Sequence, residues 1–391
     1  MKRLIGLTIA LAVVLGGCAP NFDKKDEVVQ DTKNEKSKEA IIPKYQISDD
    51  FYQTLLPYEP SKARGLVVSN LNTRLDLDEF ETGLMRIAQD PFPTDEYVFR
   101  EGQFLDTETV KSWLNRKYTS DQLKKNKMKS SENVGLNPLD DEKGSIENRS
   151  KENPEYLAHI LEHNYLVKSG DKKVKLAGIS IGLALNSVYY YQKEQYGAEY
   201  EIKIDEDKLE AEGKKIAEEV VKRMRQIKGA ENVPIMVALF EQGSKDAVVP
   251  GNFIGYSTAD ANSTSLSKWK KVKEKYYLFP SQAATKDFRD DATSFANFKQ
   301  DVEEYFPNFN GVIGKAFYVD KQLQKLTISI PMQFYGKSEV VGFTQYVTGL
   351  VMEHFPEYLA VEVNISSNNG QEALIAKKSG QKEPFVYIYH E

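Results

Sequence analysis

The residues best suited to a defined chemical step lie near the amino terminus, in the run Leu15-Gly16-Gly17-Cys18. A branched apolar residue, two small residues and a cysteine are typical of a lipobox, at which lipoprotein signal peptidase cleaves. The small side chains admit an extended chain to the peptidase, and the thiol accepts diacylglycerol before cleavage. Because the chain has only this cysteine, we predict lipidation at Cys18 and cleavage between Gly17 and Cys18. An ordinary signal peptide that happens to contain a cysteine is the alternative.

The residues before this cysteine have the length of a signal peptide. Lys2 and Arg3 give a positive start, and residues 4–15 form an apolar run of 12 residues. A membrane-spanning helix needs about 20. We therefore predict a signal peptide over residues 1–17, a lipid-anchored protein on the outer face of the cell membrane, and two maturation partners, diacylglyceryl transferase and lipoprotein signal peptidase.

A second chemical pattern is G-x-S-x-G at residues 178–182, with Ser180 at its centre. A nucleophile elbow needs a strand, a strained turn and then a helix. Residues 183–190 instead look like continued strand, which places Ser180 on a face of small residues packed under something bulky. We predict no catalytic residue here. A surface serine hydrolase, with His354 or His390 as the base, stays as an alternative.

A third pattern is H-x-x-E-H, formed by His159, Glu162 and His163. We expect a helix over residues 154–164, and on a helix two histidines four positions apart share one face and could hold a metal, with the glutamate as general base. The sequence offers no evident third ligand. We therefore predict neither a metal site nor a cofactor, and interpret the histidines as flanking the buried face of the helix.

The run Tyr189-Tyr190-Tyr191 is a candidate binding surface. Tyrosine combines an apolar ring with a hydroxyl, so alternating tyrosines on a strand could line a groove for a peptide or a cell-wall glycan. A binding lipoprotein for such a ligand is the second function that the sequence leaves open.

Composition limits the other possibilities. The chain has 391 residues, of which 40% are hydrophobic, which predicts two domains with sizeable cores. A net charge of −6 argues against nucleic-acid binding through a broadly basic face. A single cysteine excludes an intramolecular disulfide scaffold, and with four histidines it also excludes zinc-finger-type sites.

The elements that would position these residues suggest an α+β fold with two mixed domains and mainly antiparallel sheets. It follows the signal peptide and a disordered, lipidated tether over residues 18–44. The amino-terminal domain is predicted over residues 45–245, with an exposed polar insertion at 118–153 and a boundary near 243–250. Its predicted strands cover residues 65–68, 174–191 and 234–240, and residues 92–99 are predicted as a turn followed by a strand. Its predicted helices cover residues 75–88, 107–115, 154–164 and 205–227.

The carboxy-terminal domain is predicted over residues 250–391. Its predicted strands cover residues 252–257, 273–279, 312–319, 326–334, 358–365, 373–377 and 385–389. Its predicted helices cover residues 287–306 and 339–353. The second half thus follows the same order of patterns as the first, without a sequence repeat that can be aligned.

The chain resembles the CamS family, lipoproteins of Gram-positive bacteria that are described as sex-pheromone precursors. The matching stretches are TLLPY at 54–58, ARGL at 63–66, FPTD at 92–95, GQFLD at 102–106, NSVYYY at 186–191, TQYVT at 344–348 and residues 382–389. The resemblance covers the signal, the tether and essentially the whole folded part. It implies an extracellular, membrane-anchored protein with no established enzymatic activity.

The resemblance also implies that the pheromone is a short peptide cut from the end of the signal sequence, directly before the lipidated cysteine. By position, this peptide comprises Leu11, Ala12, Val13, Val14, Leu15, Gly16 and Gly17. It carries no charged side chain and is small and apolar, so it could leave a membrane and enter the hydrophobic groove of a pheromone receptor.

Overall fold

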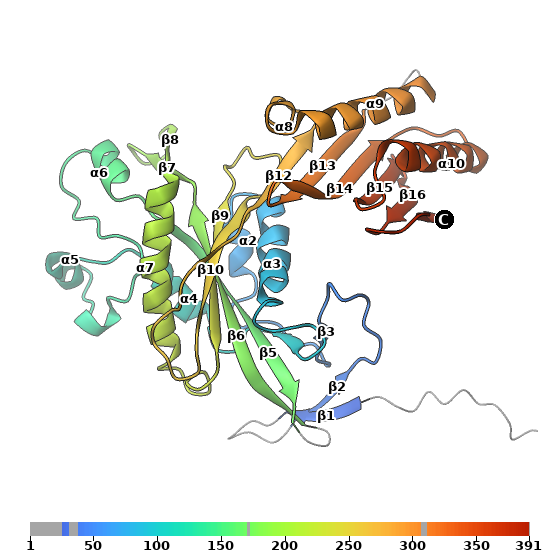
Figure 1. Ribbon diagram of the computed structural model, residues 1–391. Coiled ribbons are helices and arrows are strands. Elements are labelled where there is room, and N and C mark those ends of the chain that lie inside the picture. The colour runs from blue at the N-terminus through green and yellow to red at the C-terminus, as the bar shows by residue number, and fades with distance from the viewer. Residues whose placement is uncertain (1–25, 31–37, 170–172, 306–310, 391) are drawn as a thin grey trace, which may run out of the picture.

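The computed structural model describes residues 26–30, 38–169, 173–305 and 311–390. It is an α+β structure, as predicted, with two large mixed sheets and a separate two-stranded ribbon among the described residues (Figure 1). Most strand pairs are antiparallel, also as predicted; the parallel pairs are β1 with β6, β3 with β4, β6 with β9 and β14 with β15.

The first sheet contains nine strands of the described chain. Its main path runs in the order β11 (Lys270–Lys271), β10 (Asn252–Ala259), β9 (Ile235–Gln242), β6 (Lys173–Asn186), β5 (Leu157–Lys168), β4 (Val98–Glu101) and β3 (Gln53–Thr54). Beside this path, β1 (Asp26–Gln30) pairs with β2 (Lys38–Ile42) and with the start of β6. The central strands β5, β6 and β9 are buried over most of their length.

Helices cover both faces of this sheet. On one face lie α2 (Leu66–Asn70) and α3 (Arg74–Ala88), and on the other lie α4 (Thr107–Leu114) and α7 (Glu206–Met224) (Figure 1). The predicted helices at 75–88, 107–115 and 205–227 are thus confirmed. Side chains of Thr73 and Asp205 accept backbone hydrogen bonds at the starts of α3 and α7, which fixes where these helices begin.

The segment predicted as a polar insertion forms α5 (Ser120–Lys125), a short 3-10 turn η2 (Ser130–Glu132) and α6 (Ile146–Glu152), joined by irregular chain. Nearby, β7 (Val188–Gln192) and β8 (Glu199–Lys203) form the two-stranded ribbon.

The second sheet has the strand order β12 (Glu274–Phe279), β13 (Ile313–Val319), β14 (Gln322–Pro331), β15 (Ala360–Ser367), β16 (Gly370–Lys377) and β17 (Phe385–Ile388). One face packs against α8 (Gln282–Asp287), α9 (Arg289–Tyr305) and α10 (Lys337–His354) in a single apolar core. The predicted strands and helices of the second half are confirmed within a few residues.

The two sheets share one topology. In the first, β4, β5, β6, β9, β10 and β11 lie side by side in chain order, and in the second β12 to β17 do the same. In both, every neighbouring pair is antiparallel except the third, which is parallel because a helix, α7 or α10, crosses over between its strands. The repeated order of sequence patterns therefore reflects a repeated six-strand unit.

The predicted domain boundary at 243–250 falls inside the first sheet. The two strands that flank this segment, β9 and β10, pair directly as a hairpin. The buried carboxylate of Asp76 at the start of α3 accepts hydrogen bonds from the backbone N–H groups of Gly243 (3.1 Å) and Gly251 (2.7 Å). The Pro-Gly sequence therefore lies in a loop that these hydrogen bonds hold against α3. The chain passes to the second sheet between β11 and β12.

Two further predictions need correction. Residues 65–68 do not form a strand but lead into the helix α2, which packs against β5. The folded part also begins a few residues before Tyr45, because β2 reaches Ile42 and the side chains of Ala40 and Ile42 are buried.

The two sheets are joined by charged side chains at their contact. The guanidinium of Arg86 in α3 binds Glu79 of the same helix at 2.5 Å and Glu274 of β12 at 2.7 Å. Its carbon lies 4.8 Å from the ring centroid of Phe317 in β13. The hydroxyl of Tyr276 donates to Glu79 at 2.6 Å. One arginine therefore ties α3 of the first sheet to two strands of the second.

Candidate functional site

The H-x-x-E-H residues lie on a strand, which contradicts the predicted helix over 154–164. Residues 157–168 form β5, which pairs with β6 along its length and with β4 near its end. The local sequence favours a helix, but burial on both faces of a central strand outweighs that preference. His159 and His163 both face α3, since His159 contacts Phe80 of that helix and His163 contacts Phe99 in the same layer.

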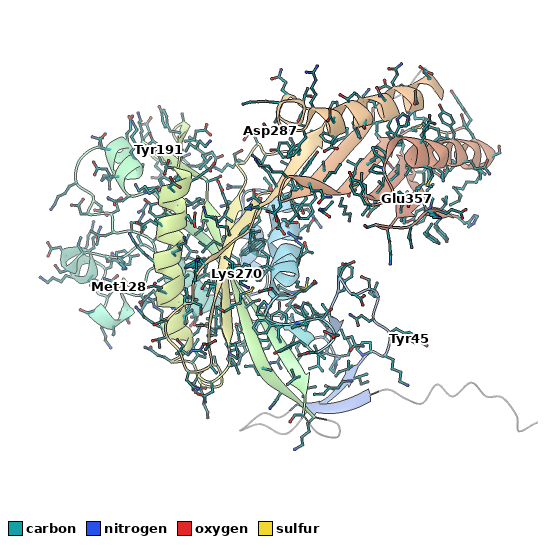
Figure 2. The ribbon with its side chains drawn as sticks, viewed as in Figure 1. Tyr45, Met128, Tyr191, Lys270, Asp287 and Glu357 are labelled. Carbon is teal, nitrogen blue, oxygen red and sulfur yellow. The ribbon has the colours of Figure 1, made fainter. Side chains whose placement is uncertain are left out.

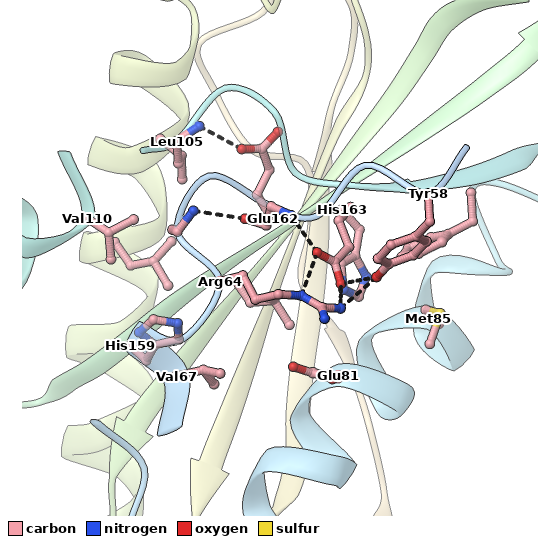
Figure 3. Close-up of a pocket in the computed structure, with 16 residues that line it drawn as sticks. Tyr58, Arg64, Val67, Glu81, Met85, Leu105, Val110, His159, Glu162 and His163 are labelled. Atoms are coloured by element: carbon pink, nitrogen blue, oxygen red, sulfur yellow. Dashed lines mark hydrogen bonds and ion pairs between the residues drawn. The ribbon is translucent and has the colours of Figure 1, made fainter. Parts of the chain in front are cut away.

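A cavity of about 170 Å³ opens beside this strand, near the place where the pairing of β4 with β5 ends. All three motif residues line it, together with side chains from the 58–67 segment, α3 and the 99–110 segment (Figure 3). Its apolar lining comprises Ala63, Val67, Met85, Phe99, Leu105, Val110, Ile160 and Leu161. We regard this cavity as the candidate functional site.

An ion pair closes one side of the cavity. The guanidinium of Arg64 donates to both carboxylate oxygens of Glu101 at the end of β4, and to the hydroxyl of Tyr58 at 2.7 Å (Figure 3). The Glu101 carboxylate also accepts from the Tyr58 hydroxyl and from the backbone N–H of Ser61. These bonds hold the segment before α2 against β4.

The same contacts set the charge of this cluster. Burial opposes ionisation of Glu101, but hydrogen bonds from Arg64 and Tyr58 outweigh it and lower the pKa of the carboxyl. The pKa of Tyr58 is raised to about 12 by burial and by its bond to Glu101. Arg64 and Glu101 are therefore both charged at neutral pH.

The two histidines are buried and neutral. Burial lowers the pKa of His159 and of His163 to about 4. His159 Nδ1 lies 3.3 Å from the side-chain amide of Asn70 in α2. His163 is only 3% exposed, and its Nδ1 has no hydrogen-bond partner within the described part of the chain.

The third motif residue, Glu162, has a structural role. Its carboxylate accepts hydrogen bonds from the backbone N–H groups of Gln103 (3.0 Å) and Leu105 (2.8 Å) and from the side chain of Asn164 (2.6 Å). Burial raises its pKa, and these bonds oppose the rise. With both oxygens occupied, Glu162 positions the 103–105 backbone. Over the described ranges, no three His, Cys, Asp or Glu side chains are grouped to hold a metal ion.

The structure confirms the packing interpretation of the G-x-S-x-G residues. They lie within the continuous strand β6, so the strained turn of a nucleophile elbow is not formed. A Cβ atom on Gly178 would stand 2.3 Å from the ring of Phe92, and one on Gly182 would stand 2.8 Å from Phe80. Ser180 is fully buried between these glycines.

Neither of the two histidines considered as a base lies near this serine. His390 follows β17, the edge strand of the second sheet. The Ser180 hydroxyl lies 3.4 Å from the hydroxyl of Tyr165. His354 belongs to α10, which packs on the second sheet, and its Nε2 lies 2.6 Å from a carboxylate oxygen of Asp301. His163 is the cross-strand neighbour of Ser180, a proximity that the sequence did not reveal.

The three tyrosines lie on β7, where their rings and hydroxyls contact neighbouring side chains. The rings of Tyr189 and Tyr191 stack at 6.5 Å, and Arg116 lies over Tyr189. The hydroxyl of Tyr190 accepts from the backbone N–H of Lys245 at 3.0 Å. Tyr191 lies near α6 (Figure 2), and none of the three tyrosines lines the cavity beside β5. Their role as a binding surface stays a prediction.

Several predicted positions fall outside the described residues: the peptide at 11–17, the cleavage site at Gly17, and Cys18. Among the residues that the structure describes, none of the helices combines the length and apolar character needed to cross a bilayer.

Residues 58–383 match the family model described as CamS sex pheromone cAM373 precursor. The chain belongs to the CamS family. No curated protein matches it significantly.

Two solved structures of CamS-type proteins are similar over most of their length. The sex pheromone precursor from Lactobacillus salivarius subsp. salivarius UCC118 is 35% identical, with a TM-score of 0.79; the match covers 89% of this chain and 98% of that one. The C-terminal domain of the sex pheromone staph-cAM373 precursor from Staphylococcus aureus is 34% identical, with a TM-score of 0.72, and the match covers 82% of this chain and 99% of that one.

Sequence reasoning missed the residues that surround the histidines. Tyr58, Arg64 and Glu81 come together with Glu101 only in the folded chain, because Arg64 and Glu101 are 37 positions apart. The H-x-x-E-H pattern is the chemical signal that points to this region, but the sequence predicts a helix for it, whereas its residues lie on the strand β5.

Proposed function

We propose that this CamS protein is anchored to the outer face of the cell membrane by lipid on Cys18 and that residues 11–17 of its leader are released as a pheromone-like peptide. The family match to a pheromone precursor carries the proposal. The lipobox at residues 15–18 supports it, because it places the lipid-accepting thiol directly after the peptide.

Two steps would produce the peptide. Lipoprotein signal peptidase cuts before Cys18 after diacylglyceryl transfer, and an intramembrane protease cuts near Leu11. The second cut requires a helical segment to unwind, and Gly16 and Gly17 weaken the helix at the other end, each by about 1 kcal/mol relative to alanine. A receptor with a hydrophobic groove would then bind the uncharged peptide.

The anchor would hold the folded part close to the membrane. Seven residues separate Cys18 from Asp26, the first residue of β1, and a fully extended chain of this length spans at most about 28 Å. Because the mature protein has a net negative charge, attraction to anionic lipid cannot replace the acyl chains in this anchoring.

Intact-mass analysis of the membrane fraction tests the anchor. We expect a mature chain that starts at Cys18 and carries acyl mass, whereas Cys18→Ala should accumulate as the unprocessed precursor. Gly16→Ala, which keeps a small residue before the cysteine, is the matched control and should be processed normally. A mature wild-type chain without acyl mass would overturn the anchor.

A second function, ligand binding by the folded part, is favoured by the cavity beside β5, which combines apolar walls with buried polar groups. The peptide or cell-wall glycan expected from the sequence concerns another surface, Tyr189 to Tyr191 on β7, which does not line this cavity. The proposal includes no enzymatic activity. Labelling of Ser180 by a serine-directed fluorophosphonate would contradict this part of it.

A further inference from the structure

The cavity beside β5 is large enough for a small organic ligand. Its volume is about 170 Å³, and a protein cavity of about 150 Å³ is known to accept a benzene ring. Val67, Met85, Phe99 and Leu105 provide apolar walls. The body of a matching ligand is therefore compact, apolar and about the size of one ring.

The opening of the cavity carries an excess negative charge. Arg64 is engaged by Glu101, so that pair is neutral as a unit. Glu81 of α3 also lines the cavity and is exposed, and its carboxylate makes no hydrogen bond or ion pair within 4.0 Å among the described residues. Partial burial of Glu81 and the nearby charge of Glu101 raise the pKa of the Glu81 carboxyl. A positive charge bound beside Glu81 would lower this pKa again.

The interior of the cavity offers one unsatisfied polar atom. Among the described residues, the buried His163 Nδ1 has no hydrogen-bond partner. A buried nitrogen left in this state is unfavourable by about 1–3 kcal/mol, so a ligand that forms a hydrogen bond with it would be favoured. Because the ring is neutral at physiological pH, this position does not repel a cation.

We propose that this cavity binds a compact organic ammonium ion, with its charged group at Glu81, its apolar body against Phe99 and Met85, and a hydrogen-bond donor at its far end directed to His163. The proposal concerns the folded part alone and does not depend on release of the leader peptide. An anion fits poorly, since Arg64 is already occupied and Glu81 would repel it.

A matched set of probes tests the charge preference. The purified full chain is titrated with 4-hydroxybenzylamine, with neutral 4-hydroxybenzyl alcohol and with anionic 4-hydroxybenzoate, by calorimetry and thermal shift. We expect the amine to bind at least about fivefold more tightly than the alcohol, and the benzoate to bind weakest. Benzylamine, which lacks the hydroxyl donor, should bind about threefold more weakly than 4-hydroxybenzylamine.

Variants locate the site. Glu81→Gln should weaken binding of the amine about fivefold or more and leave binding of the alcohol unchanged. Because Glu81 is exposed, this variant should fold. Asp78→Asn is the control, since it removes an exposed carboxylate of the same helix that does not line the cavity, and it should change affinity less than about twofold. His163→Phe should remove the difference between the two amines.

Three results would overturn the proposal. They are equal or tighter binding of the benzoate or the alcohol, an unchanged amine affinity in Glu81→Gln, and no saturable amine binding up to about 10 mM. Stoichiometric zinc binding that is lost in His163→Phe, with no amine binding, would assign the cavity to a metal instead.

Discussion

Replacing Arg86 by methionine should lower the free energy of unfolding by about 2–3 kcal/mol near pH 7. Removing one partner of a buried ion pair typically costs about 3–5 kcal/mol, because the other charge is left buried. The Arg86 side chain is 33% exposed, while those of Glu79 and Glu274 are only 8% and 9% exposed. Solvent at the arginine reduces the expected cost, and the buried carboxylates keep it well above that of a surface pair.

The cost should depend on pH in a defined direction. Burial raises the pKa of Glu79, and the charge of Arg86 opposes this rise. An acid with a raised pKa stabilises the fold below its unfolded pKa, and this contribution is lost as the pH rises through the folded pKa. Without Arg86 the pKa of Glu79 rises further, so the destabilisation should be larger near pH 7 than near pH 5, by about 1 kcal/mol.

Urea unfolding followed by circular dichroism measures both effects. Arg74→Met, an exposed arginine at the start of the same helix, is the matched control and should change stability by less than about 0.5 kcal/mol. Combining Arg86→Met with Glu79→Gln should remove most of the added pH dependence. An Arg86→Met variant as stable as the control at neutral pH would refute the role assigned to this contact between the sheets.

Other substitutions test the cores and the buried polar groups by the same unfolding assay. Gly178→Ala should lower the free energy of unfolding by about 1–3 kcal/mol, since its methyl group would overlap the ring of Phe92. An unchanged stability of Gly178→Ala would contradict this packing. Ser180→Ala should cost about 1 kcal/mol and remove no activity. Burial lowers the pKa of His163 to about 4, so the free energy of unfolding should fall by up to about 3 kcal/mol as the pH falls from about 6.5 to 4. His163→Phe should lose this acid sensitivity. An unchanged pH profile in this variant would show that the histidine is not buried in its neutral form. Lys377→Met should cost about 2–3 kcal/mol, because the buried ammonium donates to three backbone carbonyls; a cost below about 0.5 kcal/mol would contradict that role.

The elements that could be predicted from sequence are those whose local pattern and packing agree. The helix α7 has a capping aspartate, Asp205, and apolar residues at helical spacing such as Leu209 and Val220, and it was predicted nearly to its ends. The strands of the second sheet alternate between buried and less buried residues, as in β15. This two-residue period is visible in the sequence and identifies them as strands.

The errors occur where tertiary contacts outweigh local preference. The strand β5 has a helix-forming sequence and is buried on both faces, so it shows no alternation that would identify it. Conversely, Leu66–Asn70 has two valines in succession but forms the short helix α2, because it packs across the edge of β5. The hydrogen bonds from Gly243 and Gly251 to Asp76 have no signal in the local sequence, because they connect positions about 170 residues apart.

The site illustrates the same limit. From sequence, His159 and His163 are expected to flank the buried face of a helix and to hold no metal, whereas both lie on the strand β5. The cavity depends on where β4 stops and on the Arg64–Glu101 pair, which are properties of the folded chain. The glycine face around Ser180 was predicted correctly, because alternation along a strand needs only local sequence.

Release of the leader peptide is tested most directly by mass spectrometry of the culture fluid. We expect the seven-residue peptide Leu11 to Gly17, at a yield that barely changes when residues 45–391 are deleted and that falls to zero when lipoprotein signal peptidase is inhibited. Finding only longer leader fragments, or finding this peptide undiminished under inhibition, would contradict the pheromone-precursor function of this chain.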